Sequence, residues 1–569
     1  MKCGLHALID LSQGPVAPAD AAALGLTMKG SGFPFRVSDN KQASETILQD
    51  AERTTILLGH ADDVVRVSRE LGVAADVGAV QLARLALDRW GGEAARRLPG
   101  EWMLLDMQPG CLTLMQSAAR LAWMLYSRHG GQIAVSPDIT SLARLSWIGG
   151  DLDEEGFMFA VGRGPLRRQG TGRTILRDAR MLKPGECIRF MLEGTVSEVR
   201  LPFVPVPPWG GTITEAAAEA GTLLHEIVGE RLARHGDVAC LLSGGLDSSL
   251  LTMFVADRLR SGQGAVCLTS VAPPGSGLAD ELGEARLVAD RLGLDLVPVV
   301  PGASPGIYAP DAGEFVDANG PSLSVRHYLY RALAEQARSC GVTGVFDGAF
   351  GEMTVTGPIP LVSRGWALRQ FAKRLLRRGR QPQASAFHVR LAPHRLQNLP
   401  PAIAASDLDI PRVRRRNEAW GYFPGVEKIM EGPANISGIL PSEFPFRDQR
   451  LLQRFAGFPA RFLLHEGMNR APARIMMAGR LPDSIRLRTG GMPFSPDYML
   501  RLRTEAPAAR ARIPAFRTAG VADWLDLDWL DGSLARFARN GPSNVGDAFE
   551  VQLTAMVAEF LLWWRSTRD

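Results

Sequence analysis

One short run in the chain has residue types suited to phosphate chemistry: Ser-Gly-Gly-Leu-Asp-Ser-Ser at 243–249. Glycines let backbone amides approach a ligand closely, and serine hydroxyls can donate hydrogen bonds to phosphate oxygens. Asp247 would repel phosphate unless a cation lies between them, so we interpret it as a Mg²⁺ ligand. The lysine of a Walker-type loop is missing. The run therefore predicts a non-Walker cradle for nucleotide phosphates.

The segments on either side of this run would position it. An apolar stretch at 237–242 predicts a buried strand before it, and the pattern to about 260 predicts a helix after it. Further strands and helices then alternate: strands at 265–272, 294–300 and 342–348, helices at 278–293 and 324–340. Such alternation predicts an α/β domain with a parallel sheet and helices on both faces. The cradle would lie at the start of a helix, where the helix dipole favours anions.

The first 205 residues have a different character. Short segments typical of strands occur at 55–59, 101–107, 111–116, 132–136 and 187–194, and helical spacing occurs at 62–72 and 80–91. This pattern predicts an α+β sandwich-like domain at 1–205. The proline-rich stretch 201–211 predicts a linker to a second domain at 212–569. That domain contains an Arg-rich insertion at about 360–435 and a helical remainder.

Composition narrows the class of protein. A chain of 569 residues with 46% hydrophobic residues can bury several cores, and a net charge of +4 provides no general field for nucleic acid. The six cysteines include no C-x-x-C pair, which argues against a zinc ribbon or a disulfide scaffold. We find no signal peptide and no apolar run long enough to cross a membrane, so we expect a cytoplasmic protein.

The run at 243–249 resembles the SGGxDS signature of ATP-pyrophosphatase (PP-loop) enzymes, and other segments resemble the asparagine synthetases among them. The second nucleotide loop of that family is similar to 346–352, and its R-x-PFLD-x-R and G-x-LP segments are similar to 442–450 and 479–488. In the first domain, 98–102 and 182–185 resemble parts of the family's glutaminase domain. The resemblance spans about 55–195, 215–355 and 440–497. It implies a glutaminase-like (Ntn-type) sandwich and an adenine nucleotide α-hydrolase-like synthetase domain.

The resemblance also implies ATP and Mg²⁺ as cofactors and assigns roles to residues. The residues expected to hold pyrophosphate are Ser243, Gly244, Gly245, Ser248 and Ser249. The expected Mg²⁺ ligands are Asp247 and Glu352, and the expected adenine and ribose contacts are Leu242, Val271 and Gly348. Where the family has a lysine, this chain has Thr489-Gly490-Gly491, so Arg488 or Arg470 is expected to stabilise the developing anion, with Arg488 preferred.

Two departures from the family pattern bear on function. Cys3 is one position too far along to become the N-terminal nucleophile of a glutaminase, and 58–62 lacks the family's Asn-Gly-Glu glutamine-binding loop. We therefore expect no release of ammonia and interpret Cys3 as a structural thiol. Ala349 replaces the Glu or Tyr that relatives carry in the second loop, so the substrate pocket differs.

An intact ATP site without an ammonia supply suggests a substrate that carries its own amine. Lasso peptide cyclases and β-lactam synthetases fit this description. Ordering each peptide residue costs about 1–2 kcal/mol, so a threaded peptide needs a template, and the Arg-rich insertion is a candidate. Its basic residues are Arg364, Arg369, Lys373, Arg374, Arg377, Arg378, Arg380, Arg412, Arg414, Arg415 and Arg416. They could equally form a solvated face, while nucleic acid is the least favoured interpretation.

The predicted function is an AMP-forming carbon–nitrogen ligase that closes a macrolactam (isopeptide) ring in a precursor peptide, working beside a leader peptidase. Two alternatives stay open: an asparagine synthetase or β-lactam synthetase-like enzyme acting on a small molecule, and a non-catalytic scaffold. His327 and His465 could be acid–base groups, although a lone histidine is more often structural.

Overall fold

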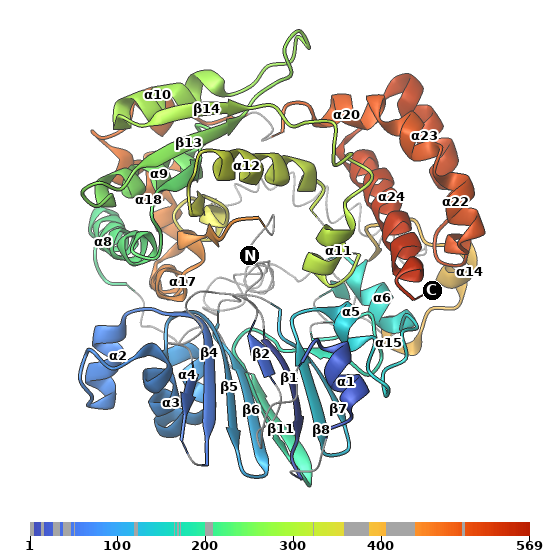
Figure 1. Ribbon diagram of the computed structural model, residues 1–569. Coiled ribbons are helices and arrows are strands. Elements are labelled where there is room, and N and C mark those ends of the chain that lie inside the picture. The colour runs from blue at the N-terminus through green and yellow to red at the C-terminus, as the bar shows by residue number, and fades with distance from the viewer. Residues whose placement is uncertain are drawn as a thin grey trace.

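The computed structural model in Figure 1 describes most of the chain. The described residues are 5–12, 16–26, 35–37, 47–50, 52–118, 123–163, 166–167, 170, 172–199, 209–321, 324–357, 386–404, 439–491 and 495–568. Cys3, every basic residue named above in the Arg-rich insertion, and residues 201–208 of the predicted linker lie outside this set. None of the described helices has the length and apolar character that crossing a membrane requires.

The N-terminal part of the chain forms two antiparallel sheets that pack face to face (Figure 1). The first sheet has the order β2 (Phe35–Val37), β1 (Leu5–Asp10), β8 (Gln132–Ser136), β7 (Leu125–His129) and β9 (Arg180–Met181). The second has the order β11 (Gly194–Val199), β10 (Glu186–Met191), β6 (Cys111–Gln116), β5 (Gly100–Gln108), β4 (Thr54–Ala61) and β3 (Ile47–Gln49). The strands predicted here are confirmed, except that 187–194 is β10, a turn and the first residue of β11.

Side chains of alternate residues explain the layers of this sandwich. Along β4, Ile56 and Leu58 face the space between the sheets, whereas Leu57 faces the opposite way, towards the helices. That outer face is covered by α2 (Val64–Leu71), α3 (Ala79–Trp90) and α4 (Ala94–Arg97). The other sheet is covered by α1 (Pro18–Ala23), α5 (Ile139–Leu142) and α6 (Glu154–Ala160). The predicted sandwich is thus a four-layer α/β/β/α arrangement.

A parallel five-stranded sheet follows α8 (Ile213–Leu232). Its order is β14 (Asp295–Val299), β13 (Ala265–Ser270), β12 (Val238–Leu241), β15 (Gly344–Asp347) and β16 (Ser442–Glu443). The connecting helices are α9 (Leu246–Arg258), α10 (Leu282–Leu292), α11 (Ala312–Ala318) and α12 (His327–Ser339). The predicted parallel sheet is confirmed. From β12 the chain moves outward in one direction to β13 and β14, then returns to the other side of β12 with β15.

Both faces of this sheet are buried. Val238 and Cys240 pack against α8, α9 and α10, whereas Ala239 and Leu241 pack on the side of α12. The crossover helices therefore lie on opposite faces before and after the reversal of strand order. In open sheets of this kind, ligands bind where the order reverses, at the carboxyl ends of the two strands on either side. Here those strands are β12 and β15.

Helices make up most of the chain after β16, as the sequence predicted. They include α17 (Gln449–Gly457), α18 (Ala471–Met477), α20 (Tyr498–Thr504), α23 (Leu527–Asn540) and α24 (Val545–Ser566). One apolar cluster joins residues of the sandwich, such as Phe157, to Phe315 beside the parallel sheet and to Phe537 of α23. The N-terminal and C-terminal parts thus share buried surface. His327 lies within this region, 4% exposed, with Nδ1 within 3.2 Å of Glu314, which supports a structural role.

Candidate nucleotide-binding site

The glycine-serine run lies at the carboxyl end of β12, as the sequence predicted. Leu242 continues the strand, because its N–H donates to the carbonyl oxygen of Leu268 on β13 at 2.9 Å. Gly245 is the residue before α9, which begins without any side-chain cap on its amides. Uncapped amides at a helix start, together with the helix dipole, form a site suited to an anion.

Gly244 is a position where only glycine fits. Its φ is +71°, a left-handed conformation that other residues adopt only with strain. A Cβ there would lie 2.5 Å from Cβ of Glu284 and 2.9 Å from the amide nitrogen of Ala285. The loop is therefore pressed against the start of α10.

The three serines of the run differ in burial and in hydrogen bonding. The hydroxyl oxygens of Ser243 and Ser248 are 3.1 Å apart, and Ser243 also accepts from the amide of Gly245 at 3.3 Å. These two hydroxyls line the loop and could turn to phosphate oxygens. Ser249 is fully buried, and within the described residues its hydroxyl has no hydrogen-bond partner. The structure thus brings Ser243 and Ser248 together and sets Ser249 apart from them.

The second loop, 346–352, touches the first. A Cβ on Gly348 would lie 2.8 Å from the amide nitrogen of Ser248, so this glycine packs directly on the start of α9. A Cβ on Gly351 would lie 1.8 Å from Oδ1 of Asp247. Between them, Phe350 has a left-handed backbone with φ of +73°. The predicted residues Gly348 and Asp247 are therefore neighbours, although they are far apart in the sequence.

Three carboxylates share this region: Asp247, Asp347 and Glu352. Burial raises the pKa of Asp247 to about 6, and the nearby charge of Glu352 raises it further, although the hydroxyl of Thr356 donates to this carboxylate. Burial also raises the pKa of Asp347 to about 6, with contributions from Glu352 and Asp247. Buried carboxylates that repel one another are costly unless a proton or a cation neutralises them.

These residues fit a hydrated Mg²⁺ bound mainly by a nucleotide. Oδ2 of Asp347 is buried and has no hydrogen-bond partner within the described residues, and Glu352 is exposed beside it. In the described part of the chain, no three Asp, Glu, His or Cys residues form a complete metal-binding group. Mg²⁺ commonly takes one or two protein carboxylates and completes its shell with phosphates and water. Asp247 and Glu352 would hold it here, and it would neutralise phosphate charge.

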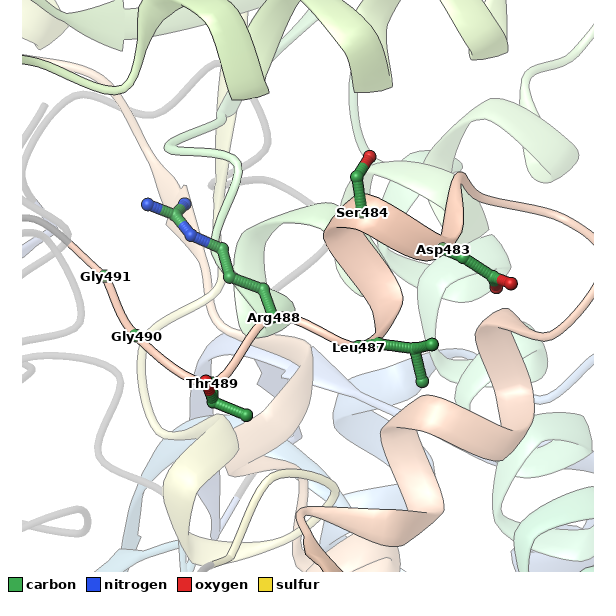
Figure 2. Close-up of a pocket in the computed structure, with 7 residues that line it drawn as sticks. All are labelled: Asp483, Ser484, Leu487, Arg488, Thr489, Gly490 and Gly491. Carbon is green, nitrogen blue, oxygen red and sulfur yellow. The ribbon is translucent and has the colours of Figure 1, made fainter.

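Arg488 lies on the other side of the phosphate loop. Its Nη2 is 2.7 Å from Oε1 of Glu281 and 3.5 Å from Oε1 of Glu284, the residue against which Gly244 packs. Its Nη1 is buried without a hydrogen-bond partner within the described residues. Figure 2 shows the side chain of Arg488 extending away from Asp483 and Ser484. These residues line a hollow of about 530 Å³ together with Gly490 and Gly491.

Arg470, the alternative to Arg488, lies closer to the carboxylates. Its positive charge opposes the rise in the pKa of Asp247, and its own backbone is left-handed at φ +65°. No ion pair or hydrogen bond of its guanidinium exists within the described residues. The side chain of Arg474 connects the two segments, since it donates to the carbonyl oxygens of Asn469, the neighbour of Arg470, and of Arg488, each at 2.8 Å.

Val271, expected at the adenine or ribose, follows β13 directly. Its amide donates to the carbonyl oxygen of Val299 at 3.0 Å, so it lies at the same carboxyl edge as Leu242 and is 8% exposed. The hydroxyl of the preceding Ser270 is buried and has no hydrogen-bond partner within the described residues. This places two apolar side chains and one polar group at the edge beside the loop.

The sequence did not indicate Thr356 and Arg474 as site residues, and it assigned no role to Asp347 and Gly351 within the second loop. Asp347 could have been assigned a role, because it is a carboxylate within the second loop and near the end of a predicted strand. Thr356 and Arg474 carry no local signal, since their contacts are with residues distant in the sequence. Gly351 belongs to the quoted loop, but only its distance to Asp247 reveals its importance.

Comparison with known proteins identifies part of the chain. Residues 219–420 match the family model described as asparagine synthase. The asparagine synthase-like segment contains β12 to β15 and both nucleotide loops, and it supports an ATP-dependent, amide-forming ligase in general terms. No curated protein matches the chain by sequence.

Two solved structures show a slight likeness to the chain. One is glutamine phosphoribosylpyrophosphate (PRPP) amidotransferase from B. subtilis complexed with ADP and GMP, at 10% identity and a TM-score of 0.23, covering 63% of this chain and 83% of that one. The other is described as the allosteric regulatory enzyme of purine biosynthesis, at 12% identity and a TM-score of 0.22, covering 61% and 68%. Likenesses this slight carry no argument about fold or function.

Proposed function

We propose that this protein uses ATP to activate a carboxylate and then joins it to an amine already present in the same substrate. The observation that carries the proposal is the contact between the two loops at the reversal of strand order. Gly244 allows the left-handed turn of the phosphate loop, Gly348 packs on the first turn of α9, and Gly351 approaches the carboxylate of Asp247. This arrangement suits a nucleotide triphosphate with its cation.

The chemistry proceeds in two balanced steps. A carboxylate oxygen of the substrate attacks the α-phosphorus of ATP, and the bond to the bridging oxygen breaks, which releases pyrophosphate. The substrate amine then attacks the activated carbonyl carbon, AMP leaves with the linking oxygen, and the amine loses a proton. An amide results, because AMP is a far better leaving group than the oxygen of a free carboxylate.

Residues of this chain would support these steps by binding and orientation. Ser243, Ser248 and the amides at the start of α9 would hold the departing pyrophosphate, and Arg470 or Arg488 would offset its negative charge. Bringing the amine and the acyl group together in one pocket lowers the entropic part of the barrier. The stretch 58–62 lacks the Asn-Gly-Glu sequence that would hold glutamine, which favours an internal amine.

We infer further that the substrate is a precursor peptide and the product a macrolactam of the lasso peptide type, made together with a leader peptidase. This rests on the altered second loop, where Ala349 stands, and on the Arg-rich insertion as a template. Ring closure in a small molecule, or asparagine formation, is the competing substrate assignment.

The test is ATP–pyrophosphate exchange with wild-type protein and with Asp247→Ala. We expect exchange that depends on a peptide carrying an N-terminal amine and an Asp or Glu side chain, and we expect the variant to lose it while keeping its fold by circular dichroism. Exchange with free aspartate instead would favour the small-molecule assignment. Full exchange by Asp247→Ala would refute the metal role, and silence with every substrate would leave the scaffold alternative.

A further inference from the structure

We propose that Glu101, which belongs to the antiparallel sandwich, is a positioning residue for the nucleotide site and holds the second loop in shape through Arg447. The inference rests on the proposed function, since it assigns a task at the same site. The sandwich would then be retained as a structural part of the ATP site instead of as a source of ammonia.

The first link is an ion pair across the boundary between the sandwich and the parallel-sheet part. Glu101 lies at the start of β5, and its Oε2 is 3.0 Å from Nη2 of Arg447, whose side chain is 0% exposed. The other oxygen of Glu101 is 3.1 Å from Nη1 of Arg231 on α8. Glu101 is itself only 4% exposed. Because both arginines are buried, removing this carboxylate would leave each of them with fewer charge partners.

The second link runs from Arg447 to the nucleotide loop. Arg447 ends the short helix η5 (Pro445–Arg447), which lies in contact with η3 (Gly351–Met353) of the second loop. Its guanidinium carbon is 5.7 Å from the ring centre of Phe350 and 5.1 Å from that of Phe444. The two rings meet edge to face at 5.5 Å. A buried cation over aromatic rings is an attractive arrangement and fixes where each ring lies.

The third link runs from Phe350 to the metal-binding carboxylate. Phe350 has φ of +73°, a conformation that a residue with a bulky side chain keeps only when its surroundings enforce it. The next residue, Gly351, has no room for a Cβ, which would lie 1.8 Å from Oδ1 of Asp247. A small shift of Phe350 would therefore change the spacing between the two nucleotide loops.

A neighbouring ion pair supplies a matched comparison. Asp62 also belongs to the sandwich, is 4% exposed, and pairs with Arg234, in the turn after α8, across the same boundary. Its other contact is with Arg450, at 3.9 Å on α17. This pair is likewise buried and of the same charge types as the pair of Glu101 and Arg447, but its arginines lie in the turn after α8 and on α17 and not over the ring of Phe350. Breaking it tests the general cost of losing a buried pair at this boundary.

Hydrogen exchange of the free, full-length protein tests the positioning role without any substrate. The amides of Met353, Thr354 and Thr356 donate within the loop, to Phe350 at 3.0 Å and to Gly351 at 2.9 Å for both threonines. In Glu101→Gln we expect these amides to exchange at least about tenfold faster than in the wild type. In Asp62→Asn we expect their exchange to stay unchanged. Equal exchange in Glu101→Gln and wild type would overturn the inference.

Equilibrium binding of a non-hydrolysable ATP analogue with Mg²⁺ separates this inference from the proposed function. We expect Glu101→Gln and Phe350→Leu each to weaken binding about tenfold, and the double variant to be no weaker than either, because both act on one chain of contacts. Phe350→Leu leaves every buried charge paired, so it carries the same test if Glu101→Gln does not fold. Wild-type affinity in Phe350→Leu would overturn the inference. Absence of binding by the wild type would instead overturn the proposed function, while the exchange result would still decide the positioning role.

Discussion

Asp247 is held in an environment that opposes its own charge, and replacing it by asparagine should therefore stabilise the protein without ligand. Burial raises the pKa of Asp247 from 3.8 to about 6, and the negative charge of Glu352 adds to the effect. Below pH 3.8, the pKa in the unfolded chain, the carboxyl is protonated in both the folded and the unfolded chain, so its ionisation does not change the free energy of unfolding. Between the two values only the unfolded chain loses its proton, and stability falls as the pH rises.

The size of the effect follows from the distance between the two pKa values. Each pH unit between them costs the folded state about 1.4 kcal/mol, so the full penalty above pH 6 is about 3 kcal/mol. The asparagine of the variant would be neutral at every pH and would still accept the hydrogen bond from Thr356. We expect Asp247→Asn to be more stable than the wild type by up to about 3 kcal/mol near pH 8, with a difference that vanishes towards pH 4.

Urea unfolding of both proteins across this pH range, without nucleotide, measures the difference. A matched series with ATP and Mg²⁺ should reverse the order, because a ligand that binds only the folded wild type stabilises it by about 4.1 kcal/mol at one thousand times its dissociation constant. A stability difference that does not change with pH, or a variant less stable than the wild type at pH 8, would refute the reasoning.

Two further predictions concern the loops. Gly348→Ala should abolish binding of the ATP analogue, because the added Cβ would lie 2.8 Å from the amide nitrogen of Ser248. The control Gly313→Ala should bind normally, since nothing lies within 4 Å of its added Cβ. Equal affinities of the two variants by calorimetry would contradict this prediction. Arg470→Gly should raise thermal stability, since left-handed backbone strain of about 1–3 kcal/mol is relieved, yet lower the rate of pyrophosphate exchange at least about tenfold. Unchanged exchange would remove Arg470 from the site.

Much of the fold followed from local patterns in the sequence. The segment at 55–59 predicted a strand, which is part of β4, and the apolar run at 237–242 predicted the buried strand β12. The serine-glycine run predicted the turn between β12 and α9, because only a few backbone conformations join a strand to a helix that tightly. Residue type identified Asp247 as a candidate ligand, and the resemblance to asparagine synthetases added Glu352.

The sequence by itself thus determined the order and type of the elements and the nature of the phosphate loop, which depend on contacts between residues close in the chain. Tertiary structure alone decided the rest. It separated Ser249 from Ser248, brought Asp347 and Thr356 to Asp247, and joined Glu101 to Arg447 across the boundary of the sandwich. The physical reason is that burial and charge at a site are summed over neighbours from several elements, and no spacing along the chain records which elements will meet.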